Sequence, residues 1–260
     1  MSKKLFIILF LLGVFLQHNL CFAKEWNSHR SSHFLVYYKK APEDFIDEVI
    51  ETAEEYYRSI TSDLGFTRFD EWSWDERAKI YIYDDLDEYV KATNQPSWSG
   101  GSASYSEKRI NTYPHASGFF DTLLPHELAH IIFREFVGLR TNLPLWLDEG
   151  VASCQEKAKR WGSAKVVKKA IADKKFIPLT ELEKVSLRSS QDKDLVELFY
   201  AESANIVYFL LTEFNRYNFV DFCKALKEGK KFDEALHKGY PRFDNLEDLN
   251  RAWISYLENE

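Results

Sequence analysis

The chain has 260 residues, enough for one large domain or two small ones, and its 45% hydrophobic and 29% charged residues are a globular balance. The formal net charge of −7 disfavours a nucleic-acid binder, because such a protein needs a basic face. Three cysteines are too few for a disulfide scaffold, and no C-x-x-C pair is present. These numbers point to an enzyme-sized globular protein with no nucleic-acid partner.

The N-terminus, residues 1–23, is expected to be a secretory signal peptide. Residues 3–4 give it a basic start, and residues 5–16 form an apolar run that is too short to span a bilayer. Cleavage is expected after Ala23. The mature chain, residues 24–260, is expected to be exported to the periplasm or the extracellular space, without a transmembrane segment.

The sequence pattern in the N-terminal part of the mature chain predicts an α/β lobe. Residues 33–38 are β-branched and aromatic, as in a strand, and residues 42–65 carry apolar side chains at helical spacing between a proline and a glycine. Residues 79–83 alternate as a second strand, and a short helix is expected over 86–93. The turn-rich stretch 97–113 is expected to form one or two edge strands beside a cleft.

The rest of the chain has a mostly helical pattern. The expected helices lie at about 121–137, 146–161, 163–174, 195–216, 218–228 and 245–258. Strands first and helices afterwards indicate an α+β fold. One domain is therefore expected over residues 24–260, with an α/β lobe over 30–120 and a mainly helical part over 121–260.

Two features of the helical part leave alternatives open. Cys154 and Cys223 are able to form a disulfide in an oxidising compartment, and two buried thiols fit the sequence as well. A basic run lies within the acidic chain and is explained by a solvated helix face or by contact with an anionic envelope polymer. This run comprises Lys157, Lys159, Arg160, Lys165, Lys168, Lys169, Lys174 and Lys175.

The pattern H-E-x-x-H runs from His126 to His130 on one of the expected helices, which Asp121 is placed to cap. Residues four apart lie on the same helix face, so both imidazoles are able to reach one metal ion. Glu127 then lies beside the ion, where a carboxylate can take a proton from water. The alternative is a buried helix with two hydrogen-bonded histidines.

A third ligand is needed, because catalytic zinc sites take three protein ligands and keep one position for water. Eighteen residues separate His130 from Glu149, which lies in P-L-W-L-D-E-G. This gap lets the first helix end and a second helix return over the metal, which makes Glu149 the expected third ligand. Glu156, on the same helix face, and Asp148 are expected to orient the histidines, with a plain polar role as the alternative.

Taken together, these motifs resemble the gluzincin metallopeptidases, specifically the peptidase MA-like group of secreted bacterial proteins. HELAH, 18 residues and the glutamate of P-L-W-L-D-E-G carry the resemblance. S-W-S-G-G-S-A and L-F-Y-A-E-S-A-N-I-V-Y-F-L support it over about residues 30–225. The resemblance implies a zincin-like α+β fold, in which a small mixed-sheet lobe holds the active-site helix, and one Zn²⁺ per chain. The related pattern often has asparagine at position 148, which leaves the role of Asp148 open.

The resemblance also implies roles for individual residues. Glu127 would be the general base that activates water for attack on a peptide carbonyl. Tyr200 is the candidate for stabilising the tetrahedral oxyanion, with a core position as the alternative. The implied zinc ligands are His126, His130 and Glu149. The implied substrate-binding edge strand comprises Gly101, Ser102 and Ala103.

The expected function is zinc-dependent hydrolysis of peptide bonds by an exported enzyme that acts on a peptide or protein. The G-x-M-E-N strand of zinc aminopeptidases is absent, because the only methionine is Met1, so that activity is not expected. The alternative function is a non-catalytic envelope binding module that contains zinc. The sequence sets neither the cleavage specificity nor the oligomeric state.

Overall fold

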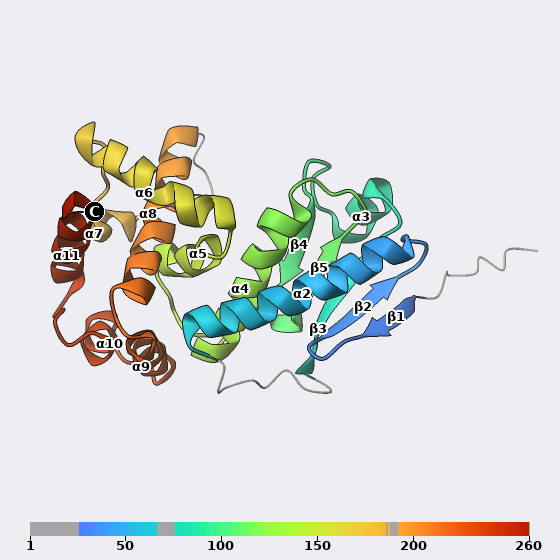
Figure 1. Ribbon diagram of the computed structural model, residues 1–260, viewed down its shortest axis with the longest axis horizontal. Coiled ribbons are helices and arrows are strands. Elements are labelled where there is room, and N and C mark those ends of the chain that lie inside the picture. The colour runs from blue at the N-terminus through green and yellow to red at the C-terminus, as the bar shows by residue number, and fades with distance from the viewer. Residues whose placement is uncertain (1–25, 67–75, 186, 188–191, 260) are drawn as a thin grey trace, which may run out of the picture.

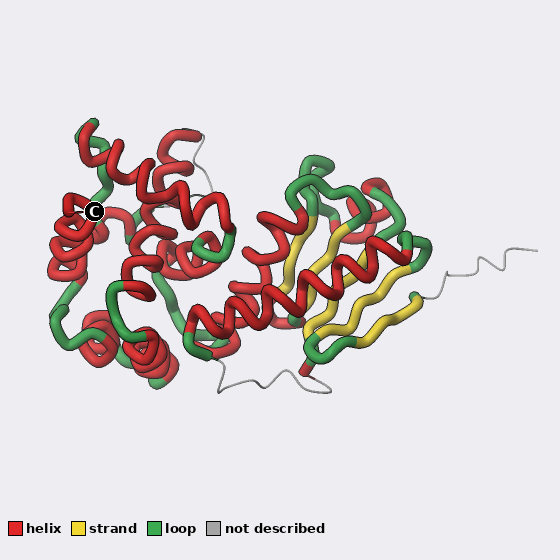
Figure 2. The backbone as a smooth tube through the Cα atoms, in the orientation of Figure 1, coloured by secondary structure: helices red, strands yellow, loops and turns green. Residues whose placement is uncertain are grey.

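The computed structural model describes residues 26–66, 76–185, 187 and 192–259. The expected signal peptide and its cleavage site therefore lie outside the described residues. A β-sheet occupies one end of an elongated molecule, and a group of helices occupies the other (Figures 1 and 2). The α+β, zincin-like fold class predicted from the sequence is confirmed by this arrangement.

The sheet has the strand order β1-β2-β3-β5-β4. Its strands are β1 (Asn27–Arg30), β2 (Phe34–Tyr38), β3 (Ala78–Ile82), β4 (Gly101–Ser104) and β5 (Arg109–Thr112). The three central strands are parallel, and Val36, Ile80 and Ile110 stand side by side in register and are fully buried. The edge strands β1 and β4 are antiparallel to their neighbours. The expectation of edge strands within 97–113 holds for β4 but is wrong for β5, which lies between β3 and β4.

Helix α2 (Glu43–Leu64) crosses one face of the sheet (Figure 1). Its apolar residues, among them Val49, Ala53 and Ile60, recur on one face and are fully buried. The helix follows Pro42 and ends at Gly65, whose φ of 77° is a left-handed conformation that glycine adopts without strain. Helix α3 (Leu86–Thr93) begins with the side chain of Asp85 accepting a hydrogen bond from the backbone N–H of Glu88.

The remaining helices follow the sheet in the chain, and all but the first of them form the second end of the molecule (Figure 1). They are α4 (Leu124–Val137), α5 (Leu145–Ser153), α6 (Lys157–Ala172), α7 (Leu179–Leu182), α8 (Lys193–Thr212), α9 (Arg216–Lys227), α10 (Phe232–Gly239) and α11 (Leu246–Asn259). The expected single helix over 146–161 is wrong, because the chain turns at residues 154–156 and starts α6. At this turn Glu156 has an extended backbone and a buried side chain. Helices α7 and α10 have no counterpart among the expected elements.

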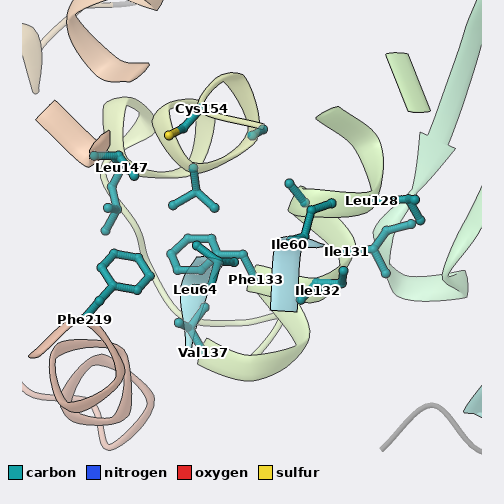
Figure 3. Packing of buried hydrophobic residues seen from close by; sticks show 14 of the residues in the cluster. Ile60, Leu64, Leu128, Ile131, Ile132, Phe133, Val137, Leu147, Cys154 and Phe219 are labelled. Carbon is teal, nitrogen blue, oxygen red and sulfur yellow. The ribbon is translucent and has the colours of Figure 1, made fainter. Parts of the chain in front are cut away.

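Helix α4 packs through its apolar side against helices from both ends of the molecule. Figure 3 shows Leu128 and Phe133 of α4 among side chains of α2, α5 and α9, such as Ile60, Leu147 and Phe219. Each of these residues is fully buried. The apolar side of α4 is thus fixed by packing, and its polar side is left to carry the histidines.

Helix α8 is the one helix in the described part of the chain that is long and apolar enough to cross a membrane. Its small and apolar residues, including Ala204 and Val207, are buried, and the helix contacts α5 and α6 along its length. This packing is that of a core helix. Cys154 and Cys223 are likewise fully buried, and each is a free thiol, so the disulfide considered from the sequence is not formed.

Glu202 of α8 is a buried carboxylic acid that gives folding a pH dependence. Its Oε1 accepts a hydrogen bond of 2.9 Å from the backbone N–H of Ile177, and its Oε2 has no hydrogen-bond partner among the described residues. Burial raises the pKa of Glu202 from 4.5 to about 8. The neutral acid therefore stabilises the fold fully below pH 4.5, and this contribution is lost as the pH rises through 8.

The ionisation of Glu202 should lower the free energy of unfolding between pH 5 and 8. We expect this decrease to be smaller in Glu202→Gln by roughly 3–5 kcal/mol. The amide keeps the acceptor for Ile177 and does not ionise. Urea unfolding of both proteins at several pH values checks this. Parallel pH profiles, offset by a constant, would contradict it.

Candidate metal centre

Helix α4 presents His126 and His130 on one face, with their Nε2 atoms 3.2 Å apart. The sequence prediction that Asp121 caps this helix is wrong. Asp121 lies in a π-helical turn, Phe119–Leu123, and no side chain of the described residues caps α4. The reason is that the chain is already helical at Leu123, whose backbone N–H is bonded to the carbonyl of Gly118.

Helix α5 brings Glu149 to the two histidines. Its Oε2 lies 3.6 Å from His126 Nε2 and 3.8 Å from His130 Nε2. The next residue, Gly150, lets α5 approach α8 closely, because a Cβ atom there would lie 2.4 Å from the carbonyl oxygen of Ser203. Close packing of α5 on α8 thus determines where Glu149 meets α4.

These three residues fit a zinc ion. Their ligand atoms lie within 4.8 Å of one another. A tetrahedral zinc site with bonds of about 2.05 Å has edges of about 3.3 Å, close to the 3.2, 3.6 and 3.8 Å found here. Glu149 Oε2 is buried and has no hydrogen-bond partner in the described part of the chain, as expected of an atom that binds a metal. Two imidazoles and one carboxylate are also the donor set that zinc prefers.

Each histidine has a carboxylate behind it. Glu156 Oε1 lies 2.8 Å from His126 Nδ1, and Asp148 Oδ1 lies 3.2 Å from His130 Nδ1. Each contact fixes the imidazole with Nε2 toward the ligand cluster, and each carboxylate accepts the proton on Nδ1. Both acids are buried. The structure therefore places Asp148 and Glu156 beside the histidines. Glu156, however, comes from the turn between α5 and α6 and not from the helix face of Glu149 that the sequence predicted.

Arg134, one turn beyond His130 on the same helix face, was not singled out from the sequence. Its Nε and Nη2 donate to the two oxygens of Asp148 at 3.0 and 2.6 Å, and its Nη1 donates to the carbonyl of Thr141 at 3.1 Å. Burial alone would raise the pKa of Asp148, but the contacts with His130 and Arg134 lower it. Arg134 lies four residues after His130, a spacing that places both side chains on one helix face and could have indicated this contact.

We expect Arg134→Lys to weaken zinc binding about 10-fold, because lysine keeps the charge but cannot donate to both oxygens of Asp148. Competition with a chromophoric chelator measures the affinity. Arg140→Lys in the next loop is the matched control, since Arg140 is exposed and forms no salt bridge in the described part of the chain. Equal zinc affinity in both variants would show that Arg134 does not position His130.

Glu127 lies beside the ligand cluster without belonging to it. Among the described residues, its buried Oε2 has no hydrogen-bond partner. Burial raises the pKa of Glu127, and the neighbouring histidines only partly offset this. A carboxylate with a raised pKa next to a metal site has the proton affinity required of a general base.

Two tyrosines flank the cluster. Tyr200, on α8, has its pKa raised to about 12 by burial and by the carboxylates Glu149 and Glu156, so its hydroxyl stays protonated beside the ligands. Tyr105 starts a 3₁₀ turn, Tyr105–Glu107, and its ring centroid lies 5.1 Å from that of His130. Burial and Glu127 raise the pKa of Tyr105 as well. No spacing rule ties Tyr105 to H-E-x-x-H, and the sequence offered no signal for it.

Strand β4 contains Gly101, Ser102 and Ala103 and leads directly into Tyr105. It pairs with β5 on one side, and no other described strand pairs with its second side. A Cβ atom on Gly101 would lie 2.7 Å from the carbonyl of Asn111, so a larger residue would push β4 away from β5. The predicted edge strand therefore exists and leads into the turn that contacts α4, the helix that carries the two histidines.

A family model described as the peptidase MA superfamily matches residues 73–259. No curated protein matches the chain. The matched segment runs from β3 to α11 and includes α4 and α5, which carry His126, His130 and Glu149. It begins and ends later than residues 30–225, the range predicted from the sequence. The predicted gluzincin-like domain is confirmed by this match, which covers well over half of the sequence. The chain belongs to the peptidase MA superfamily.

Proposed function

We propose that this protein is a zinc-dependent peptidase that hydrolyses peptide bonds in peptides or proteins. The observation that carries the proposal is the convergence of His126, His130 and Glu149 within 4.8 Å, with the carboxylate of Glu127 beside them. Peptidase MA proteins are usually zinc-dependent, which agrees with this donor set. A site built only for structural zinc would fill the fourth position with a protein ligand, and no such ligand joins the cluster among the described residues.

Bound zinc would act there as a Lewis acid toward a carbonyl and would acidify water. Glu127 takes the proton of the attacking water on its buried Oε2 and then delivers it to the leaving amine. The hydroxyls of Tyr200 and Tyr105 remain protonated and supply donors for the oxyanion. The unpaired edge of β4 offers backbone groups to an extended peptide.

The test is cleavage of a mixed peptide library by the purified mature protein, analysed by mass spectrometry. Zinc-loaded protein is expected to cleave defined bonds, chelated protein to be inactive, and added zinc to restore cleavage. Stoichiometric zinc without cleavage of any peptide would overturn the peptidase proposal in favour of the non-catalytic binding module. Failure to bind zinc would overturn both functions.

Export is a further part of the proposal and rests on the composition of residues 1–23. The protein secreted from its host is expected to begin at Lys24. N-terminal sequencing of the chain expressed with residues 1–260 tests this. An N-terminus that retains the apolar run would contradict cleavage.

A further inference from the structure

Lys159, in the first turn of α6, contacts two residues that border the metal centre. Its Nζ lies 2.8 Å from Glu156 Oε1, the same oxygen that contacts His126 Nδ1 at 2.8 Å. Nζ also lies 4.7 Å from the ring centroid of Tyr200. One carboxylate thus separates this ammonium group from a zinc ligand.

The other cations of the basic run are placed differently. Arg160 forms a salt bridge with Asp63 at 2.6 Å, and Lys169 pairs with Asp173 on the outside of α6. Lys165 is exposed and forms no salt bridge in the described part of the chain. The solvated helix face considered from the sequence describes Lys165 and Lys169, whereas Lys159 has a defined position beside the ligands.

The ammonium group of Lys159 keeps donor capacity for a ligand. It has three N–H donors, of which Glu156 takes one and the face of Tyr200 accepts a second contact. The side chain is 38% exposed, so it can be reached from solvent. Two fixed contacts hold the charge in one place, which lowers the entropy lost when it binds an anion.

A local cation matters because the protein as a whole repels anions. The chain carries a net charge of −7, and Glu127, Glu149 and Glu156 add acidic groups at the site itself. A specific counter-charge near the site therefore favours the binding of an acidic peptide. Lys159 is the positive group that contacts both Glu156 and Tyr200.

We propose that Lys159 binds a carboxylate of the substrate and that the protein selects peptides with a carboxylate near the bond to be cleaved. The carboxylate belongs either to an aspartate or glutamate side chain or to a free C-terminus. This inference rests on the proposed peptidase function, whose substrate class it narrows.

The experiment measures peptide affinity without turnover. Zinc-loaded Glu127→Gln protein is titrated with three fluorescent peptides of one scaffold: an amidated neutral peptide, the same peptide with one glutamate, and the neutral peptide with a free C-terminus. Each titration is repeated with Lys159→Gln added, and with Lys165→Gln added as the control for loss of one charge on the same helix.

We expect one carboxylate-bearing peptide to bind about 10- to 100-fold more tightly than the neutral peptide. Lys159→Gln should remove that preference, and Lys165→Gln should keep it. The peptide that gains affinity identifies the source of the carboxylate. Equal affinities for all peptides, a preference that survives Lys159→Gln, an equal loss with Lys165→Gln, or no binding at all would each overturn the proposal.

The zinc affinity of Lys159→Gln shows whether Lys159 binds substrate or supports the metal site. Lys159→Gln should bind zinc within about 3-fold of its parent, because Glu156 still contacts His126. A fall of 10-fold or more would show that Lys159 acts through Glu156 on the metal and would overturn the proposal. Cleavage by the parent enzyme without any charge preference would overturn only the role of Lys159, whereas a preference without cleavage would overturn only the peptidase function.

Discussion

Glu127→Gln is expected to lower kcat by about 10²- to 10⁴-fold while the zinc content stays at one per chain. The amide has nearly the shape of the carboxylate, but it cannot take a proton from water. Glu127 is not among the clustered ligand atoms, so the metal keeps its three protein ligands. Steady-state cleavage of a peptide found in the library screen, together with metal analysis of the same samples, measures both quantities.

Glu127→Asp is the companion variant, because it keeps the ionisable group and withdraws it by one methylene. Its kcat should lie between those of the parent and Glu127→Gln. If Glu127→Gln lost zinc and activity in parallel, the carboxylate would be supporting the metal site rather than moving a proton. Unchanged kcat in Glu127→Gln would exclude Glu127 as the base.

Glu149→Ala is expected to weaken zinc binding by at least about 100-fold, since loss of a residue that merely orients a ligand already costs 10- to 100-fold. The Nε2 atoms of His126 and His130, 3.2 Å apart, would remain, but the buried Oε2 of Glu149 would be gone. Chelator competition at fixed pH measures the affinity. Loss of peptide cleavage should follow the zinc content of the variant.

Glu197→Ala is the matched control for this change, because Glu197 is an exposed glutamate on α8 with no salt bridge among the described residues. It should bind zinc as tightly as the parent. Circular dichroism of the apo proteins shows whether Glu149→Ala keeps the fold. A folded Glu149→Ala protein with parental zinc affinity would exclude Glu149 as a ligand.

The sequence identified the residues whose positions depend on simple geometry. Helical periodicity places His126 and His130 on one face, and the 18-residue gap allows α5 to bring Glu149 back to them. Local signals also predict the boundaries of the N-terminal lobe. Pro42 and Gly65 mark the two ends of α2, and alternating side chains mark β3.

The features that the sequence did not reveal depend on tertiary contacts. Residues 146–161 have helical propensity throughout, but Glu156 turns inward to His126, and this contact breaks the helix. Tyr105 reaches His130 because β4 pairs with β5 and delivers the following turn to α4. Neither contact leaves a periodic signal in the chain.

The two buried thiols give the protein intrinsic reporters of local opening. Cys154 caps the end of α5, five residues after Glu149, and Cys223 lies on α9. Burial raises the pKa of both thiols, so in the closed protein they are nearly unreactive toward disulfides and alkylating reagents. The alkylation rate of each thiol therefore reports local opening of the helix region in which that thiol lies. Alkylation of Cys154 would follow the opening of the ligand-bearing helix in real time, separately from the opening of α9.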